Sequence, residues 1–144
     1  MTEEERIFAG KLYAPGAPEL VAMKRKGHRL LIDDFGMGNT SIIYLRSNLF
    51  DVIKLDGSIT QNILTSRSNQ QIVSSLTSLS RQMHLRVVAE FVESAAQRDR
   101  LAEIGCDAFQ GYLYSKPLNV FEFVDLLDKG ILLEIRAEDC YIFD

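Results

Sequence analysis

A chain of 144 residues, 47% hydrophobic and 25% charged, has the size and composition of a single soluble globular domain. Its formal net charge of −4 and its pI near 5.2 argue against the basic surface that binds a DNA or RNA backbone. No apolar run approaches the roughly 20 residues that span a bilayer, and the acidic start MTEEERIFAG is unlike a signal peptide. The sequence therefore predicts a cytoplasmic protein with reduced thiols. Cys106 and Cys140 lack CxxC spacing, so a zinc site is not predicted.

Short aliphatic runs alternate with helical periodicities along the chain. Pro18 suits the first turn of a short helix that Gly27 stops. Apolar residues recurring at steps of three and four predict an amphipathic helix over 68–83. Strands are predicted at 29–33, 51–55, 86–90 and near 107–110.

Two further helices follow the third and fourth predicted strands. Each opens with a capping-box pair, and a glycine, Gly105 or Gly130, ends it: the pairs are Ser94 with Gln97, and Asn119 with Glu122. We interpret the aromatic residues between 109 and 123 as core and helix packing.

This order of elements predicts an α/β fold with a parallel sheet, because the spacing between strands suits crossover units better than hairpins. Two arrangements of the sheet are consistent with this order: an open doubly wound sheet, or part of a (βα) TIM-type barrel. A complete barrel takes about 250 residues, so this chain would supply about half of one.

Polar side chains stand at the end of each predicted strand. They are Asp33 and Asp34, then Lys54, Glu90 and Gln110. Parallel strands bring these ends to one rim, where α/β proteins place their ligands. A lone Asp-Asp-Phe-Gly could equally be a turn, and Lys54 a solvated strand end; the shared rim favours a common site.

Metal-assisted chemistry suits this set of side chains. Adjacent aspartates can hold one or two ions such as Mg²⁺ or Mn²⁺, which in turn bind phosphate oxygens. Two ions about 3.5 to 4 Å apart are a common arrangement for phosphodiester hydrolysis. In this interpretation Lys54 orients water or neutralises developing charge, and Glu90 binds metal or acts as the general base.

Three sequence blocks resemble the EAL family, bacterial signalling phosphodiesterases that hydrolyse cyclic di-GMP to pGpG. The blocks are LLIDDFGMGNTSIIYLRSNLFDVIKLDGSIT, RVVAEFVES and GCDAFQGYLYSKPL. The resemblance covers about residues 19–128 and implies the C-terminal half of the barrel, about its last four βα units. It divides the chain into a helical segment at 1–18, the half barrel at 19–130, and a tail or strand at 131–144.

The resemblance also implies roles for individual residues. Asp33 and Asp34 match the metal-binding pair, and Lys54 matches a lysine beside the attacking water. Glu90 matches a metal-associated or general-base glutamate. The remaining matches are Asp56, an acidic site residue; Glu93, which steadies the loop after the aspartates; Gln110, an active-site glutamine; and Lys116 with Pro117, a guanine-side block. The implied cofactor is Mg²⁺ or Mn²⁺, and the implied ligand is cyclic di-GMP.

The chain also departs from the family pattern. Met37 and Asn39 replace a threonine and a tyrosine, while Phe91 and Ser94 replace a glycine and a threonine. The Glu-Ala-Leu block and two other metal-ligand blocks are not found in this sequence. Three functions are therefore possible: a truncated phosphodiesterase, a non-catalytic module that binds a cyclic dinucleotide or another protein, and a structural remnant whose signature residues are idle.

Residues 1–26 resemble a different family, the N-terminal cap of maltose-type sugar O-acetyltransferases. No hexapeptide repeat follows this segment, so the sequence does not predict acetyl transfer. A half barrel has two open sheet edges and an open apolar interior. We therefore expect a homodimer or a larger assembly.

Overall fold

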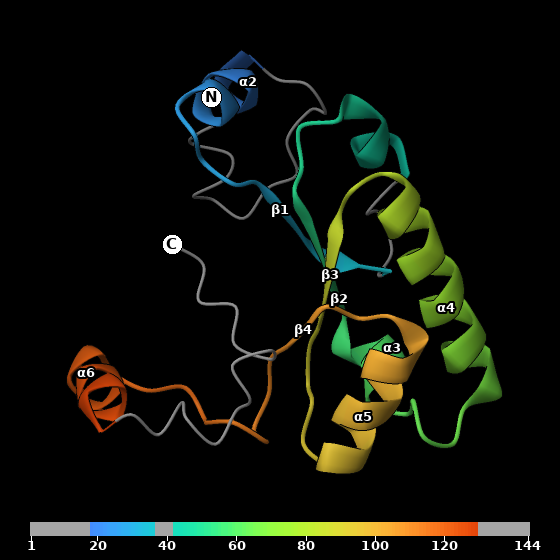
Figure 1. Cartoon of the computed structure of the whole chain (residues 1–144), viewed down its shortest axis with the longest axis vertical. Helices are drawn as coiled ribbons and strands as arrows, with labels where there is room; N and C mark the ends of the chain where they lie inside the picture. The colour runs from blue at the N-terminus through green and yellow to red at the C-terminus, as the bar shows by residue number, and fades with distance from the viewer. Residues whose placement is uncertain (1–17, 37–41, 130–144) are drawn as a thin grey trace.

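The computed structural model describes residues 18–36 and 42–129, and these residues form one parallel sheet with helices around it (Figure 1). The elements in chain order are α2 (Pro18–Arg25), β1 (Leu31–Phe35), the 3-10 helix η1 (Ile42–Ser47), β2 (Val52–Leu55), α3 (Gly57–Thr60), α4 (Arg67–Gln82), β3 (Arg86–Ala89), α5 (Ala95–Ile104), β4 (Ala108–Phe109) and α6 (Val120–Asp128).

The sheet has the strand order β1-β2-β3-β4, and every neighbouring pair is parallel. Each predicted strand is present, within two residues of its predicted start. A parallel sheet in which sequential strands are neighbours is the arrangement of a (βα) barrel, whereas a doubly wound sheet reverses its order. The predicted partial barrel is therefore confirmed, and the open doubly wound alternative is not.

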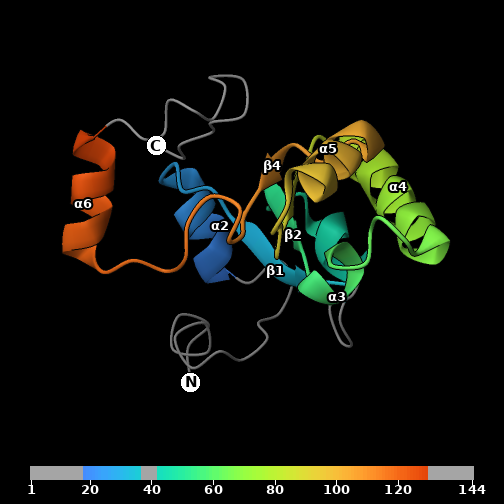
Figure 2. The same cartoon turned by 90° about the horizontal axis from the view of Figure 1, so that it is seen from below.

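Helices α3, α4 and α5 lie on the same side of the sheet (Figures 1 and 2). The strand side chains on that side belong to the main hydrophobic core: Ile32, Ile53, Leu55, Val87 and Ala89. Alternate residues face the other side, because side-chain direction has a period of two along a strand. On that inner face Val52 and Val88 are buried, while Leu31 at the β1 edge is 40% exposed. The sequence predicted an exposed apolar inner face. On that face Val52 and Val88 are buried, and the exposed apolar side chain is that of Leu31 at the edge.

Capping explains where the longer helices begin and end. The capping boxes predicted from Ser94 and Asn119 are both formed, with reciprocal bonds to the third helical residue. Gly105 ends α5 in the left-handed region at φ 116°, a conformation that suits glycine. Two details differ from prediction: a 3-10 helix stands after β1, and the short α3, capped by Asp56, precedes α4.

The interpretation of the late aromatic residues as packing is wrong for most of them. Tyr112, Phe121 and Phe123 are 59%, 83% and 50% exposed, and none of the residues of α6 is buried. Only Phe109 packs against the core. The apolar periodicity predicted helix α6 correctly. It could not show that the apolar side chains of α6 are exposed among the described residues.

Several predictions fall on residues that the structure does not describe. These are the segment at 1–17, Met37 and Asn39, the terminating Gly130, and the tail at 131–144 with Cys140. Within residues 18–36 and 42–129, no helix combines the length and the hydropathy that a membrane span requires.

Candidate metal and phosphodiester site

A bulge at the end of β1 brings two consecutive aspartates to the same place. Successive side chains of a regular strand point to opposite faces. Here the register with β2 shifts between Ile32 and Phe35, and Asp34 adopts φ 51°. This break in the alternation turns both carboxylates to the rim, and the Asp34 amide donates a hydrogen bond of 2.9 Å to Asp33 Oδ1.

Glu90 joins the two aspartates from the end of β3. One carboxylate oxygen of each residue lies within 4.8 Å of the others. Both aspartates are exposed, whereas Glu90 is buried. The sequence prediction that strand ends would gather these three carboxylates is thus matched by their placement.

Lys54, at the end of β2, supplies the positive charge beside this cluster. Its Nζ lies 2.7 Å from Glu90 Oε1 and 3.0 Å from Asp33 Oδ1. Burial lowers the pKa of Lys54, but the hydrogen bonds and charges of Glu90 and Asp33 outweigh burial, so the pKa lies above its ordinary value of 10.5. The ammonium is therefore fully charged at neutral pH.

The backbone beside Glu90 is held in a costly conformation. Phe91 has φ 56°, in the left-handed region that an aromatic residue rarely adopts. Thr60 Oγ1 donates to the Glu90 carbonyl, and the Val92 amide donates to the Gln110 carbonyl at 3.1 Å. These bonds on both sides of Phe91 fix the loop, which is how a strained residue is tolerated next to a site.

Phe91 also contacts the loop after β2. A β-carbon on Gly57 would lie 2.3 Å from the Phe91 ring, so the ring rests directly on the glycine. Gly57 begins α3, next to its cap Asp56. Phe91, which follows Glu90, thus links the end of β3 to the start of α3, three residues after Lys54. The sequence marked Phe91 as a departure from the family but did not reveal this contact.

The other predicted site residues occupy varied positions. Asp56 caps α3, and its carboxylate accepts a 2.7 Å bond from the Ser58 amide. Hydrogen bonds from the Ser58 side chain and from its amide hold the pKa of Asp56 below its ordinary value. Gln110 follows β4 on the same rim, with an exposed side chain. Glu93 is exposed, and its amide donates to Gln97 Oε1. Neither Asp56, Glu93 nor Gln110 belongs to the three-carboxylate cluster.

The predicted guanine-side block lies in the loop after Gln110. Lys116 Nζ stands 5.6 Å from the centre of the Tyr112 ring, within the range of a cation–π contact. Lys116, Pro117 and Tyr112 are all exposed. Lys116 thus presents a positive charge, and Tyr112 an aromatic ring, on the surface of this loop.

The cluster fits a hard divalent cation. Its donors are carboxylate oxygens from Asp33, Asp34 and Glu90, the ligand type that Mg²⁺, Mn²⁺ and Ca²⁺ prefer. Two exposed carboxylates and one buried carboxylate beside a single lysine leave net negative charge at the rim, which favours a cation.

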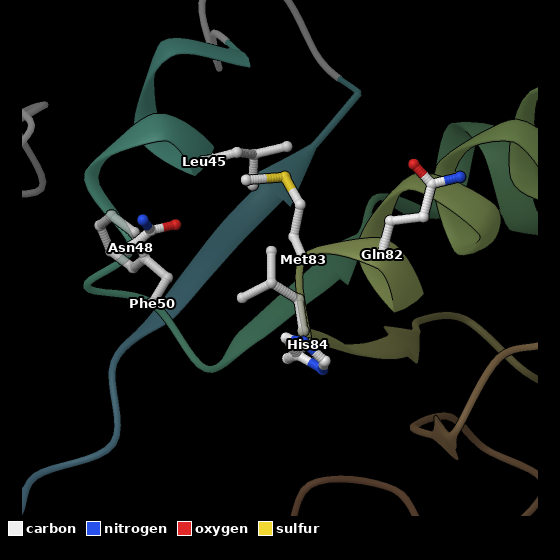
Figure 3. A pocket seen from close by; sticks show the side chains of 7 residues that line it. Leu45, Asn48, Phe50, Gln82, Met83 and His84 are labelled. Atoms are coloured by element: carbon white, nitrogen blue, oxygen red, sulfur yellow. The ribbon is translucent and has the colours of Figure 1, made fainter.

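A separate hollow of about 410 Å³ opens at the opposite end of the strands (Figure 3). It is lined by residues just before β2 and β3: Leu45, Asn48, Phe50, Gln82, Met83, His84 and Leu85. Because these residues precede the strands, the hollow lies away from the carboxylate rim and takes no part in the site.

A protein family and several known sequences are similar to this chain. The EAL domain model matches residues 11–117, which includes the described strands. This match begins inside the segment whose resemblance to O-acetyltransferases was noted above, and that resemblance stays a prediction. The cyclic di-GMP phosphodiesterase NbdA of Pseudomonas aeruginosa is 40% identical over 101 residues, which is 70% of this chain and 13% of NbdA.

Solved structures agree with the fold. The PaMucR phosphodiesterase in complex with c-di-GMP has a TM-score of 0.66 and 32% identity, over 72% of this chain and 42% of that chain. A manganese and cyclic di-GMP complex of Klebsiella pneumoniae BlrP1 has a TM-score of 0.64 and 35% identity, over 69% of this chain and 25% of that chain. This chain thus spans 13%, 42% and 25% of the length of NbdA, PaMucR and BlrP1. With the family model matching most of its length, the chain belongs to the EAL domain family.

Proposed function

We propose that the rim of this chain binds a divalent cation and cyclic di-GMP and hydrolyses the dinucleotide to pGpG. The observation that carries the proposal is the convergence of Asp33, Asp34 and Glu90, with oxygens within 4.8 Å of one another, beside Lys54. Family membership and the phosphodiesterase names of NbdA and PaMucR support the choice of substrate. Residues 19–130 would form the functional unit.

The position of each side chain suggests its role in the proposed hydrolysis. Glu90 is buried and paired with Lys54, so it is held in place to accept a proton from water. The Lys54 ammonium can neutralise charge that develops on a phosphoryl oxygen. Gln110 on the same rim can hydrogen-bond a nucleotide, while Glu93 and Asp56 steady the neighbouring loops.

Asp33, Asp34 and Glu90 would hold the cation. When bound, Mg²⁺ or Mn²⁺ supplies Lewis-acid activation of water and a counter-charge for the phosphate. The donor set suits both ions, and the manganese complex of BlrP1 makes Mn²⁺ a practical choice for experiments.

One observation favours a second candidate, a module that binds cyclic di-GMP without cleaving it. A clamp of two ions needs more ligands than one three-carboxylate cluster, the only one found within residues 18–36 and 42–129. One ion at this cluster could still hold a phosphate of the dinucleotide.

Incubation with cyclic di-GMP separates these candidates. The purified chain with Mn²⁺ or Mg²⁺ should release pGpG, measured by chromatography and mass spectrometry, and Asp33→Asn should lose this activity. Saturable binding by the wild type without product would establish the binding module. No binding and no product would remove both candidates.

We propose further that the protein works in the cytoplasm as a homodimer or a larger assembly. Its substrate would be an intracellular nucleotide, and the buried Cys106 is a free thiol. The exposed apolar side chains of α6 support self-association.

A further inference from the structure

The short helix α3 contacts the chain next to both parts of the carboxylate cluster. A β-carbon on Gly36, two residues after Asp34, would overlap the Cδ1 atom of Ile59, so this side chain rests on the glycine. The next residue, Thr60, donates a hydrogen bond from Oγ1 to the carbonyl of Glu90. Two adjacent residues of α3 therefore connect the segment after the paired aspartates with the residue that supplies the third carboxylate.

Hydrogen bonds from two longer helices hold α3 in place. Asn69, in α4, donates from Nδ2 to the Ile59 carbonyl at 2.9 Å. Gln97, in α5, donates from Nε2 to the carbonyl of Gln61, the residue that ends α3, at 3.0 Å. Because α3 is tied to both helices, a bond from α3 to the end of β3 fixes that strand end relative to the rest of the fold.

The hydroxyl of Thr60 acts on a strained peptide. Thr60 is 1% exposed, so water does not compete for its bond to the Glu90 carbonyl. That carbonyl belongs to the peptide between Glu90 and Phe91, and Phe91 has φ 56°. A strained residue keeps its conformation only where neighbouring contacts hold it. The bond from Thr60 thus restrains the backbone from which the Glu90 side chain extends.

We propose that Thr60 is a positioning residue for the cation site. Through the carbonyl of Glu90, its hydroxyl keeps the Glu90 carboxylate close to the paired aspartates, with oxygens of the three residues within 4.8 Å of one another. Hydrogen-bond partners that orient metal ligands commonly change metal affinity tenfold or more when they are removed. This inference rests on the proposed cation site, and it requires neither nucleotide binding nor catalysis.

Two substitutions at Thr60 test the role of the hydroxyl. Thr60→Val removes the hydroxyl but keeps the size and branching of the side chain, so we expect about tenfold weaker Mn²⁺ binding, measured by electron paramagnetic resonance. Thr60→Ser keeps the hydroxyl and should therefore keep the Mn²⁺ affinity of the wild type.

Thr77 offers a matched control away from the rim. It is 3% exposed, and its Oγ1 donates at 3.1 Å to the carbonyl of Ile104, which precedes β4 at the opposite end of the strands. Thr77→Val removes the same kind of buried bond between distant segments, so both valine variants should unfold at lower urea concentration. Only Thr60→Val should bind Mn²⁺ more weakly, which separates positioning from a general loss of stability.

Amide hydrogen exchange in the absence of metal gives a second measurement. The amides of Glu90 and Val92 donate to carbonyls at the end of β2 and just after β4. If the Thr60 hydroxyl restrains this segment, both amides should exchange faster in Thr60→Val than in Thr77→Val. Equal exchange rates in the two variants would show that the hydroxyl does not hold Glu90 in place.

The Mn²⁺ titrations could also overturn this role for Thr60. Wild-type affinity in Thr60→Val would show that the hydroxyl does not position the cluster. Equal weakening in Thr77→Val would assign the effect to lost stability, and equal weakening in Thr60→Ser would assign it to the methyl group. A wild type that binds no Mn²⁺ would instead refute the proposed cation site, and the exchange comparison would then decide whether Thr60 holds Glu90.

Discussion

Lys54 and Glu90 form an ion pair across the ends of neighbouring strands β2 and β3, with 2.7 Å between nitrogen and oxygen. The side chains are only 16% and 11% exposed, so the pair is largely shielded from water. The same ammonium lies 3.0 Å from Asp33. Lys54 therefore offsets part of the negative charge that a bound cation would otherwise neutralise, and lysine and cation compete for the same carboxylates.

Removing this lysine should strengthen cation binding. Lys54→Met deletes a positive charge a few ångströms from the cluster while keeping an unbranched apolar stem. Because a positive charge a few ångströms away repels a divalent cation, we expect a gain of at least about tenfold in Mn²⁺ affinity. Titration followed by electron paramagnetic resonance measures the free ion. Weaker Mn²⁺ binding by Lys54→Met would show that the lysine supports the metal site instead of competing with the ion.

Amide substitutions at the cluster should weaken cation binding. Asp33→Asn, Asp34→Asn and Glu90→Gln keep the side-chain shape but remove a charged ligand, so each should cost at least about tenfold in Mn²⁺ affinity. Asn also tolerates the left-handed conformation of Asp34. Glu103→Gln is the matched control, because Glu103 is exposed near the end of α5 and pairs with Arg100. Equal affinities across all four variants would exclude the site.

Two glycines should respond differently to alanine. A β-carbon on Gly111 would lie 2.1 Å from the Val92 carbonyl oxygen, and backbone cannot move aside. On Gly57 it would meet the Phe91 ring, which is 49% exposed and can swing away. Urea unfolding should show a loss of about 1 to 3 kcal/mol for Gly57→Ala, and more for Gly111→Ala.

A double-mutant cycle sharpens this test. Phe91→Ala should relieve the cost of Gly57→Ala, because the overlapping ring is gone, but it should not relieve Gly111→Ala. Strictly additive free energies for Gly57→Ala and Phe91→Ala would mean that the ring does not rest on the glycine.

The charge of Asp56 should stabilise the fold only above strongly acidic pH. Its hydrogen bonds to Ser58 lower the folded pKa below the ordinary 3.8. The stabilisation is therefore present above about pH 4 and is lost as the pH falls through the folded pKa. Asp56→Asn keeps a capping oxygen without a charge. Thermal melts should show this variant less stable than wild type at pH 7, with the gap narrowing as the pH falls below the ordinary pKa of 3.8; a constant gap would contradict the assignment.

Cys106 should be inert in the folded protein. Burial raises the pKa of its thiol to about 12, so about one molecule in ten thousand carries the reactive thiolate at pH 8. In a Cys140→Ser variant, Ellman's reagent should label the chain only after unfolding in urea. Rapid labelling of the native variant would show that the core around Cys106 opens readily.

Much of the fold could be predicted from local patterns. The strands, the capping boxes at Ser94 and Asn119 and the glycine stop at Gly105 all depend on residues close in sequence, and all are present. The gathering of Asp33, Asp34 and Glu90 on one rim also followed, because parallel strand ends share an edge.

Other features depend on contacts between distant segments and could not be predicted. The register shift that turns Asp34 toward Asp33 arises from pairing with β2. The contact of Phe91 with Gly57 joins two loops 34 positions apart in the chain. The exposure of the α6 side chains among the described residues depends on packing against other segments, which the local periodicity of α6 does not carry.

Calorimetric titration of cyclic di-GMP in the presence and absence of Mn²⁺ tests the central claim most directly. We expect saturable binding with Mn²⁺, little binding in excess EDTA, and at least tenfold weaker binding by Asp33→Asn, with Glu103→Gln unchanged. Binding that is equally tight in EDTA, or that survives Asp33→Asn, would contradict a metal-dependent nucleotide site at this rim.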